Sequence, residues 1–139
     1  MTYSFRAYYS LHQAHSAVFR AADKALRKQE GIQTAHQFVL FVLYVEDGLP
    51  SAIVASRAGM SKSRLTGLTN TLEDKGLIRK QRGEKDARQQ VLYIAPEGRA
   101  LIERTKDWVS EMNADLLADF DERERMTIEK FLRRAASSR

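Results

Sequence analysis

One stretch of the chain decides its fold: "MSKSRLTGLTNTLEDKG", residues 60–76. Its three leucines recur at intervals of three and four residues, the spacing that places side chains on one face of a helix. Ser61 is a residue type that caps the start of a helix, and Gly76 is one that ends it. The pattern therefore predicts a helix over residues 61–75 with one buried face.

The opposite face of this helix carries residues that weaken a helix. Gly67 alone costs roughly 1 kcal/mol relative to alanine in a helix interior. Asn70 and the neighbouring threonines are also poor helix formers. Small hydroxyl and amide side chains beside Arg64 are suited to base edges and phosphate oxygens. We interpret this face as one that contacts DNA, the alternative being the ordinary polar face of a surface helix.

The flanking segments complete a DNA-binding pattern. Residues 51–59 predict a short helix that Ser51 caps and Gly59 ends, so a helix-turn-helix precedes Gly76. Two short β-type runs follow, residues 77–82 and 90–95, and they predict a β-hairpin with a charged tip.

The hairpin carries a basic arm, made by Arg79, Lys80, Arg82, Lys85 and Arg88. Asp86, two residues before Arg88, is expected to hold that arginine by an ion pair. An arginine held in this way is suited to the narrow minor groove, where the negative potential is concentrated.

The remaining segments predict long amphipathic helices. One runs over residues 5–29 with Gly31 as its stop, and a second starts at Thr34 as its cap. Residues 46–50 read as a turn because Asp-Gly and proline interrupt regular structure. Helices over 97–120 and after the cap Asp121 follow.

The composition restricts the function. The net charge of +5 lies entirely in residues 57–99, which hold ten basic and five acidic side chains. A basic region in an otherwise neutral chain is typical of a polyanion binder, although a solvated basic surface remains an alternative. The chain has no cysteine, no run of about 18 apolar residues and no signal-peptide pattern. We therefore expect a cytoplasmic protein with no membrane partner.

Residues 32–102 resemble the winged-helix transcription regulators of the multiple antibiotic resistance regulator (MarR) family. The resemblance rests on "SKSRLTGLTNTLEDKGLIRKQ", on "DAR" at the hairpin tip and on "APEGRAL". It implies a mainly α fold with a small β-wing in a single chain of residues 1–139. A winged helix-turn-helix over 32–96 would bind DNA, and the terminal segments 1–31 and 97–139 would form a helical dimerisation lobe.

The expected function is that of a dimeric, sequence-specific transcription regulator, a ligand-responsive repressor. Helix 61–75 would read the major groove of a pseudo-palindromic double-stranded operator, and the wing, residues 77–95, would enter the minor groove. The candidate DNA-binding residues are Ser61, Lys62, Ser63, Arg64, Thr66, Gly67, Asn70, Arg82, Lys85, Asp86 and Arg88. Apolar faces on the terminal helices favour a homodimer over a compact monomer.

Regulators of this kind often bind a small aromatic effector between the dimerisation lobe and the winged domain. The residues that would line such a pocket here are Tyr8, His12, His15, Phe38 and Phe41, although each is also suited to a core or an interface. The three histidines, without cysteine or a compact acidic cluster, make a weak metal site, so we expect no metal and no cofactor.

Two other functions were weighed against this one. A winged-helix protein-interaction or architectural module would bind DNA weakly and without sequence preference. An enzyme is not expected, because the sequence has no nucleophile-elbow or phosphate-loop motif.

Overall fold

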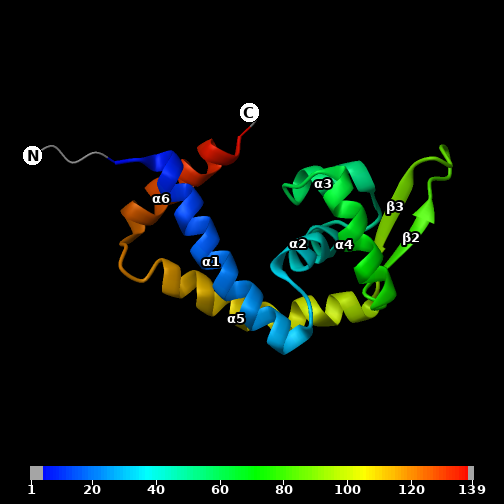
Figure 1. The fold of residues 1–139 in the computed structure, drawn as a ribbon, viewed down its shortest axis with the longest axis horizontal. Coiled ribbons are helices and arrows are strands. Elements are labelled where there is room, and N and C mark those ends of the chain that lie inside the picture. The colour runs from blue at the N-terminus through cyan, green and yellow to red at the C-terminus, as the bar shows by residue number, and fades with distance from the viewer. Residues whose placement is uncertain (1–4, 138–139) are drawn as a thin grey trace, which may run out of the picture. The chain divides into compact units, whose positions relative to one another are not determined.

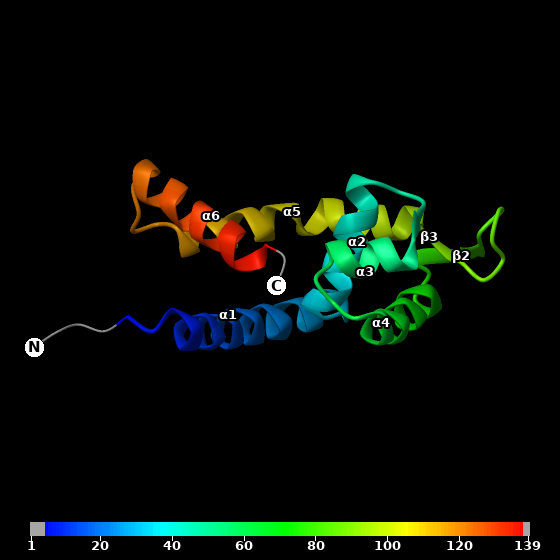
Figure 2. The same cartoon turned by 90° about the horizontal axis from the view of Figure 1, so that it is seen from above.

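The structure is a computed structural model that describes residues 5–137. The chain divides into two compact units, Met1–Glu103 and Arg104–Arg139. Figures 1 and 2 show the elements in two views. The helices are α1 (Ala7–Glu30), α2 (Thr34–Val45), α3 (Ser51–Arg57), α4 (Lys62–Asp74), α5 (Pro96–Leu116) and α6 (Glu122–Ala136), and the strands are β1 (Leu49–Pro50), β2 (Ile78–Arg82) and β3 (Gln90–Ile94).

The wing is a small antiparallel sheet. Its strand order is β1-β3-β2, and Lys80 of β2 lies opposite Leu92 of β3. The predicted hairpin is confirmed, and both views show it extending beyond the end of α4 (Figures 1 and 2). The third strand, β1, was not predicted, because two residues in a turn that contains proline carry no period-two pattern.

The first unit has one apolar core beneath the helix-turn-helix. Helix α2 lies against α3, α4 and β3, and these elements share a buried interior. The side chains that are almost fully buried include Leu26, Leu40, Leu43, Val54, Leu65, Leu72, Ile78 and Leu92. The predicted leucine stripe of α4 is confirmed at its two ends, which fixes the face that α4 turns away from the core.

The middle of that stripe differs from the prediction. Leu68 is only half-buried, whereas Thr69 beside it is 1% exposed. The Thr69 hydroxyl donates to the Thr66 carbonyl at 3.1 Å, and this bond makes its burial tolerable. Threonine therefore occupies a core position that the sequence pattern assigned to the exposed side.

Three of the predicted helix ends are confirmed. Gly31, in a left-handed conformation with φ 71°, ends α1. The Ser61 side chain accepts from the Arg64 backbone N–H at 3.1 Å, and Asp121 accepts from Glu124 N–H at 2.8 Å. These caps satisfy backbone donors that the first turn of a helix leaves unpaired.

Two predicted caps are wrong. Thr34 is the first residue of α2 and Gln33 is its cap, while the Thr34 N–H donates to Asp23 Oδ1 at 2.7 Å. Ser51 is the first residue of α3 and Pro50 is its cap. The Ser51 hydroxyl instead donates to the Gln90 carbonyl at 3.3 Å, because β1 brings the start of α3 beside β3. At both positions a polar group near the start of the helix therefore bonds to a residue distant in sequence: the Thr34 N–H to Asp23 and the Ser51 hydroxyl to Gln90.

The second unit contains the rest of α5 and all of α6. Helix α5 ends at Leu116, four residues before the predicted end, and no residue of α6 is buried. Several large apolar side chains in this unit are exposed: Leu116, Phe120, Met126, Phe131 and Leu132. Among the helices described, none combines the length and the apolar character that a membrane span requires.

Candidate nucleic-acid interface

The face of α4 that points away from the core is continuous and polar. All seven candidate residues on and just before this helix are exposed: Ser61, Lys62, Ser63, Arg64, Thr66, Gly67 and Asn70. The helix follows the turn after α3 and lies against β2 (Figure 1). Its exposed face and the wing are therefore brought into one region of the first unit.

Gly67 has no internal reason to be glycine. A Cβ atom built at this position would meet nothing within 4 Å, and the residue has no positive φ. The protein thus carries an unfavourable helix residue at a position where no contact in the described part of the chain requires glycine.

Two threonine hydroxyls on α4 are already bonded within the helix. Thr66 donates to the Lys62 carbonyl at 3.0 Å, and Thr71 donates to the Gly67 carbonyl at 3.3 Å. Each hydroxyl has a single proton, so a donation to a phosphate would replace the bond within the helix. For Thr66 this needs only a turn of the hydroxyl about its Cβ–Oγ bond.

The wing tip holds its arginine as expected. Asp86 Oδ1 accepts from the Arg88 backbone N–H at 3.0 Å and lies 3.3 Å from Arg88 Nε. The Arg88 side chain is nevertheless 94% exposed. The predicted ion pair is confirmed, and it orients a guanidinium that has most of its surface free.

The turn that leads to this pair requires glycine. The Gly83 N–H donates to the Gln89 carbonyl at 2.7 Å, closing the tip. A Cβ at Gly83 would lie 2.7 Å from the Asp86 carbonyl oxygen, which is too close for any real contact. Gly83 therefore maintains the backbone that positions Asp86 and Arg88, while Arg82 and Lys85 are exposed on either side of it.

Lys80 does not belong to the basic arm, and the expectation that it does is wrong. Its side chain is 12% exposed and donates to Asn70 Oδ1 on α4. It also lies 3.9 Å from the Glu73 carboxylate. Alternation along β2 puts Lys80 on the same face as the buried Ile78, whereas Arg79 points the other way and stacks over Tyr93 at 5.5 Å.

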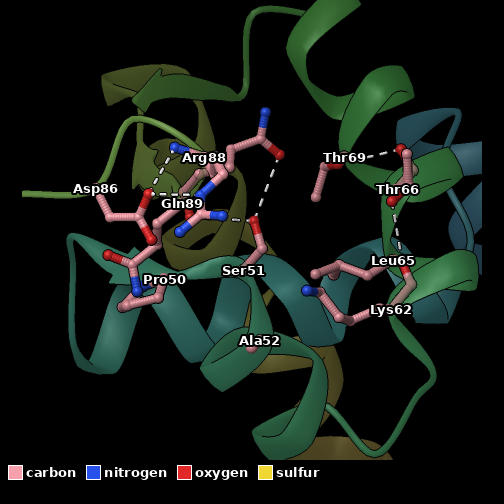
Figure 3. A pocket seen from close by; sticks show the side chains of 11 residues that line it. Pro50, Ser51, Ala52, Lys62, Leu65, Thr66, Thr69, Asp86, Arg88 and Gln89 are labelled. Atoms are coloured by element: carbon pink, nitrogen blue, oxygen red, sulfur yellow. Dashed lines mark hydrogen bonds and ion pairs between the residues drawn. The ribbon is translucent and has the colours of Figure 1, made fainter. Parts of the chain in front are cut away.

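A polar cavity of about 370 Å³ lies between the wing and the helices α3 and α4 (Figure 3). Lys62 and Thr66 of α4 line one side, and Asp86 and Arg88 line the other. The sequence did not single out the rest of its lining, which comprises Pro50, Ser51, Ala52, Leu65, Thr69, Gln89 and Gln90. Of these, Gln89 and Gln90 could have been predicted as site residues, because they directly follow Arg88 in the sequence.

The residues predicted to line an effector pocket are spread over α1 and α2 in the first unit. Tyr8 and His12 line an open hollow of about 560 Å³ together with Tyr9 and Leu11, all of them from α1. His15 contacts Phe19 at 4.7 Å, and Phe19 contacts Phe38 at 5.7 Å between ring centres. Phe41 is exposed on α2. One chain alone thus places four of these side chains in two separate pairs, Tyr8 with His12 and His15 with Phe38.

His36 lies at the start of α2, where its Nδ1 accepts from the Gln33 backbone N–H at 3.0 Å. Burial lowers its pKa below the ordinary 6.5, and the positive charges of Lys75 and Arg64 lower it further. Asp23 acts in the opposite direction. Within residues 5–137, no three His, Asp or Glu side chains are grouped so that they could hold a metal ion.

Comparison with known proteins shows which sequences this chain is similar to. Residues 30–89 match the family model described as MarR family. A Thauera aromatica protein named as a transcriptional regulatory protein for the hcr operon is 26% identical over 126 residues, which are 91% of this chain and 76% of that protein.

Solved structures show the same fold. Staphylococcus aureus MepR in a DNA complex is 24% identical, with a TM-score of 0.87 over 98% of this chain and 100% of that one. PcaV of Streptomyces coelicolor, a transcriptional regulator solved with its natural ligand, is 25% identical, with a TM-score of 0.81 over 99% of each chain. The helix-turn-helix and the three-stranded wing together give this chain a winged-helix fold, and its residues 30–89 are similar to the MarR family.

Proposed function

We propose that this protein is a dimeric, sequence-specific DNA-binding transcription regulator that represses until an effector releases it. Helix α4 reads the major groove of a pseudo-palindromic operator, and the wing enters the adjacent minor groove through Arg88. Two copies of the chain present two α4 helices to the two half-sites, about one turn of DNA apart.

The observation that carries this proposal is the pairing of two features in one region. An exposed polar face on α4 includes a bare Gly67, and beside it Asp86 holds an exposed Arg88. The cavity between them, with Lys62 on one wall and Arg88 on the other, is suited to a backbone phosphate that passes from one groove to the next.

Exposed apolar side chains on the terminal helices support the dimer. Tyr8 on α1 is 93% exposed, and α6 buries none of its residues although Phe131 and Leu132 are on it. A second copy of the chain that packs on these helices would remove them from water. The dimerisation lobe, residues 1–31 and 97–139, is part of this proposal.

Release by an effector is the less direct part of the proposal. It is supported by the aromatic side chains on α1 and α2 and by the likeness to PcaV, which was solved with a ligand. The second copy of the chain or the ligand itself would have to complete a pocket from these separate side chains.

The test is a titration of the purified protein against the duplex that flanks its own coding region and against a scrambled duplex, at several salt concentrations. We expect tighter binding to the native duplex, with an affinity that falls steeply as salt rises, because each neutralised phosphate releases counterions. Arg88→Ala should weaken this binding and flatten its salt dependence by about one phosphate contact. Lys106→Ala, which removes an exposed cation of α5, is the matched control and should change neither.

Equal and weak binding to both duplexes would contradict a specific regulator of that region. The same titration against a random duplex library then separates an operator elsewhere from the interaction-module alternative. An enriched sequence supports the first, and no enrichment supports the second.

A further inference from the structure

The contact between Lys80 and Asn70 connects the wing to the exposed face of α4. Lys80 lies opposite the fully buried Leu92, so its stem belongs to the core face of the sheet. Its ammonium group reaches α4 and ends between Asn70 and Glu73. A cation that is 12% exposed in this way is poorly placed to meet phosphates, and its position calls for another role.

The chemistry of lysine determines how the Asn70 amide is turned. An ammonium group only donates hydrogen bonds, so the atom of Asn70 that faces it must be the carbonyl oxygen. The amide NH₂ group of Asn70 therefore points away from Lys80. Because Asn70 is exposed on the outer face of α4, this group is the part that a ligand of that face would meet.

An asparagine in this orientation is poorly suited to the usual pair with adenine. That pair needs the amide oxygen to accept from adenine N6 while the NH₂ group donates to N7. Lys80 uses one of the two lone pairs of that oxygen, and its positive charge opposes a second donor there, so Asn70 acts mainly through its NH₂ donors. In the major groove the keto oxygens of guanine and thymine accept, whereas the amino groups of adenine and cytosine donate.

We propose that Lys80 is a specificity-determining positioning residue that fixes the Asn70 amide, so that α4 prefers a keto base over an amino base at the step that Asn70 meets. Glu73 keeps the ammonium group in place by attracting it from its other side. This inference rests on the proposed function, since it requires α4 to lie in the major groove.

The experiment is a selection from a random duplex library with the full chain and three variants. The parent should enrich guanine or thymine at one position of each half-site, and the selection itself shows which of the two. Lys80→Met keeps a stem of similar length but removes the donor, so adenine should rise at that position by roughly fivefold to a hundredfold relative to the keto base.

Two variants control for charge and for packing. Lys80→Arg, which also only donates, should keep the keto preference. Arg79→Met removes a cation from the same strand but from its other face, and should keep the preference as well. An unchanged base at every position in Lys80→Met overturns the inference, because a purely structural lysine would not set a base.

A second measurement needs no variant. In the selected duplex, 6-thioguanine in place of guanine, or 4-thiothymine in place of thymine, replaces the keto oxygen by sulfur, a much weaker hydrogen-bond acceptor, and keeps the ring N–H that pairs with the opposite strand. The parent should bind the altered duplex about tenfold more weakly, and equal binding overturns the inference. A parent that enriches no sequence at all overturns the proposed function itself, which is a different result from an enriched sequence that Lys80→Met leaves unchanged.

Discussion

Gly67 provides a test in which stability and binding change in opposite directions. A methyl group at this position meets open space within the chain, so Gly67→Ala should raise the free energy of unfolding by up to about 1 kcal/mol. If α4 enters a groove as proposed, the same methyl group takes space that DNA needs, and affinity should fall. Thermal denaturation and duplex titration of one preparation measure both effects.

A glycine on α4 that touches nothing would give a different result. In that case Gly67→Ala would be more stable and would bind equally well, and the close approach to DNA at this residue would be refuted. Gly59→Ala is a useful contrast, because its φ of 69° makes alanine strained there and predicts a loss of stability.

Asp86 provides a test of orientation against charge. Asp86→Ala removes a negative charge that would lie next to the DNA in the proposed complex, and on charge alone affinity should rise. It also frees Arg88, whose Nε lies 3.3 Å from that carboxylate, so orientation predicts that affinity falls. We expect the fall in a titration against the selected duplex, and Arg88→Ala should show no further loss when it is combined with Asp86→Ala.

At the scale of single residues, the sequence predicted polar exposure well and burial of polar groups poorly. The ion pair at the wing tip followed from two neighbouring charges and is present. The inward position of Lys80 and the burial of Thr69 did not follow, because both depend on which element packs against them. For Lys80 the alternation of β2 held the signal, since Ile78 lies on the same face.

At the scale of elements, the start of α2 predicts a pH dependence of stability. Burial and two nearby cations lower the pKa of His36 in the folded chain, so the unfolded chain binds that proton more readily. The free energy of unfolding is therefore expected to fall as the pH drops below about 6.5. The loss of stability due to His36 is complete once the pH is below the folded-state pKa. Protonation also removes the acceptor that Nδ1 offers to the Gln33 N–H.

The variant His36→Gln isolates this effect. Glutamine at the third helix position can still accept from the cap backbone but does not titrate. Urea denaturation at a series of pH values should show a weaker fall for His36→Gln than for the parent. His12→Gln, which changes an exposed histidine of α1, should behave like the parent, and a parent that is no more pH-sensitive than His36→Gln would contradict the prediction.

Elements with a regular apolar spacing along several turns or strand residues were predicted, whereas elements that depend on pairing with a distant strand were not. The helices and the hairpin followed from apolar spacing and from Gly31, Ser61 and Asp121 at their ends. Strand β1 exists only because β3 pairs with it, and the start of α3 changed its cap for the same reason. A local reading of Leu49–Pro50 has no access to that pairing.

At the scale of the whole molecule, the proposed dimer predicts a sharp difference between two faces of α6. Phe131 lies on the apolar face that spacing defines, whereas Met126 is exposed on the opposite side of the same helix. A glutamate that an interface would bury is costly, and one in water is not. Phe131→Glu should therefore weaken the dimer, while Met126→Glu should not.

Sedimentation equilibrium over a range of concentrations measures this difference directly. The parent and Met126→Glu should show twice the mass of one chain at concentrations where Phe131→Glu shows a single chain. Circular dichroism of each variant gives the helix content, which should be alike in all three. A parent with the mass of one chain would contradict the dimer and leave the apolar side chains of α6 without a cover.

The strand order of the wing has a consequence for the protein in the absence of DNA. Because β2 is an outer strand, its free edge is a template on which another chain could add a strand and begin an aggregate. Three of its five residues are cationic: Arg79, Lys80 and Arg82. Outward and inward charges of this kind keep edges apart, so the wing discourages self-association by these three residues, two of which, Arg79 and Arg82, would also draw it to a polyanion. Variants that neutralise several of them to abolish DNA binding will also become more prone to aggregate, and a loss of binding in such variants has to be separated from a loss of dispersed protein.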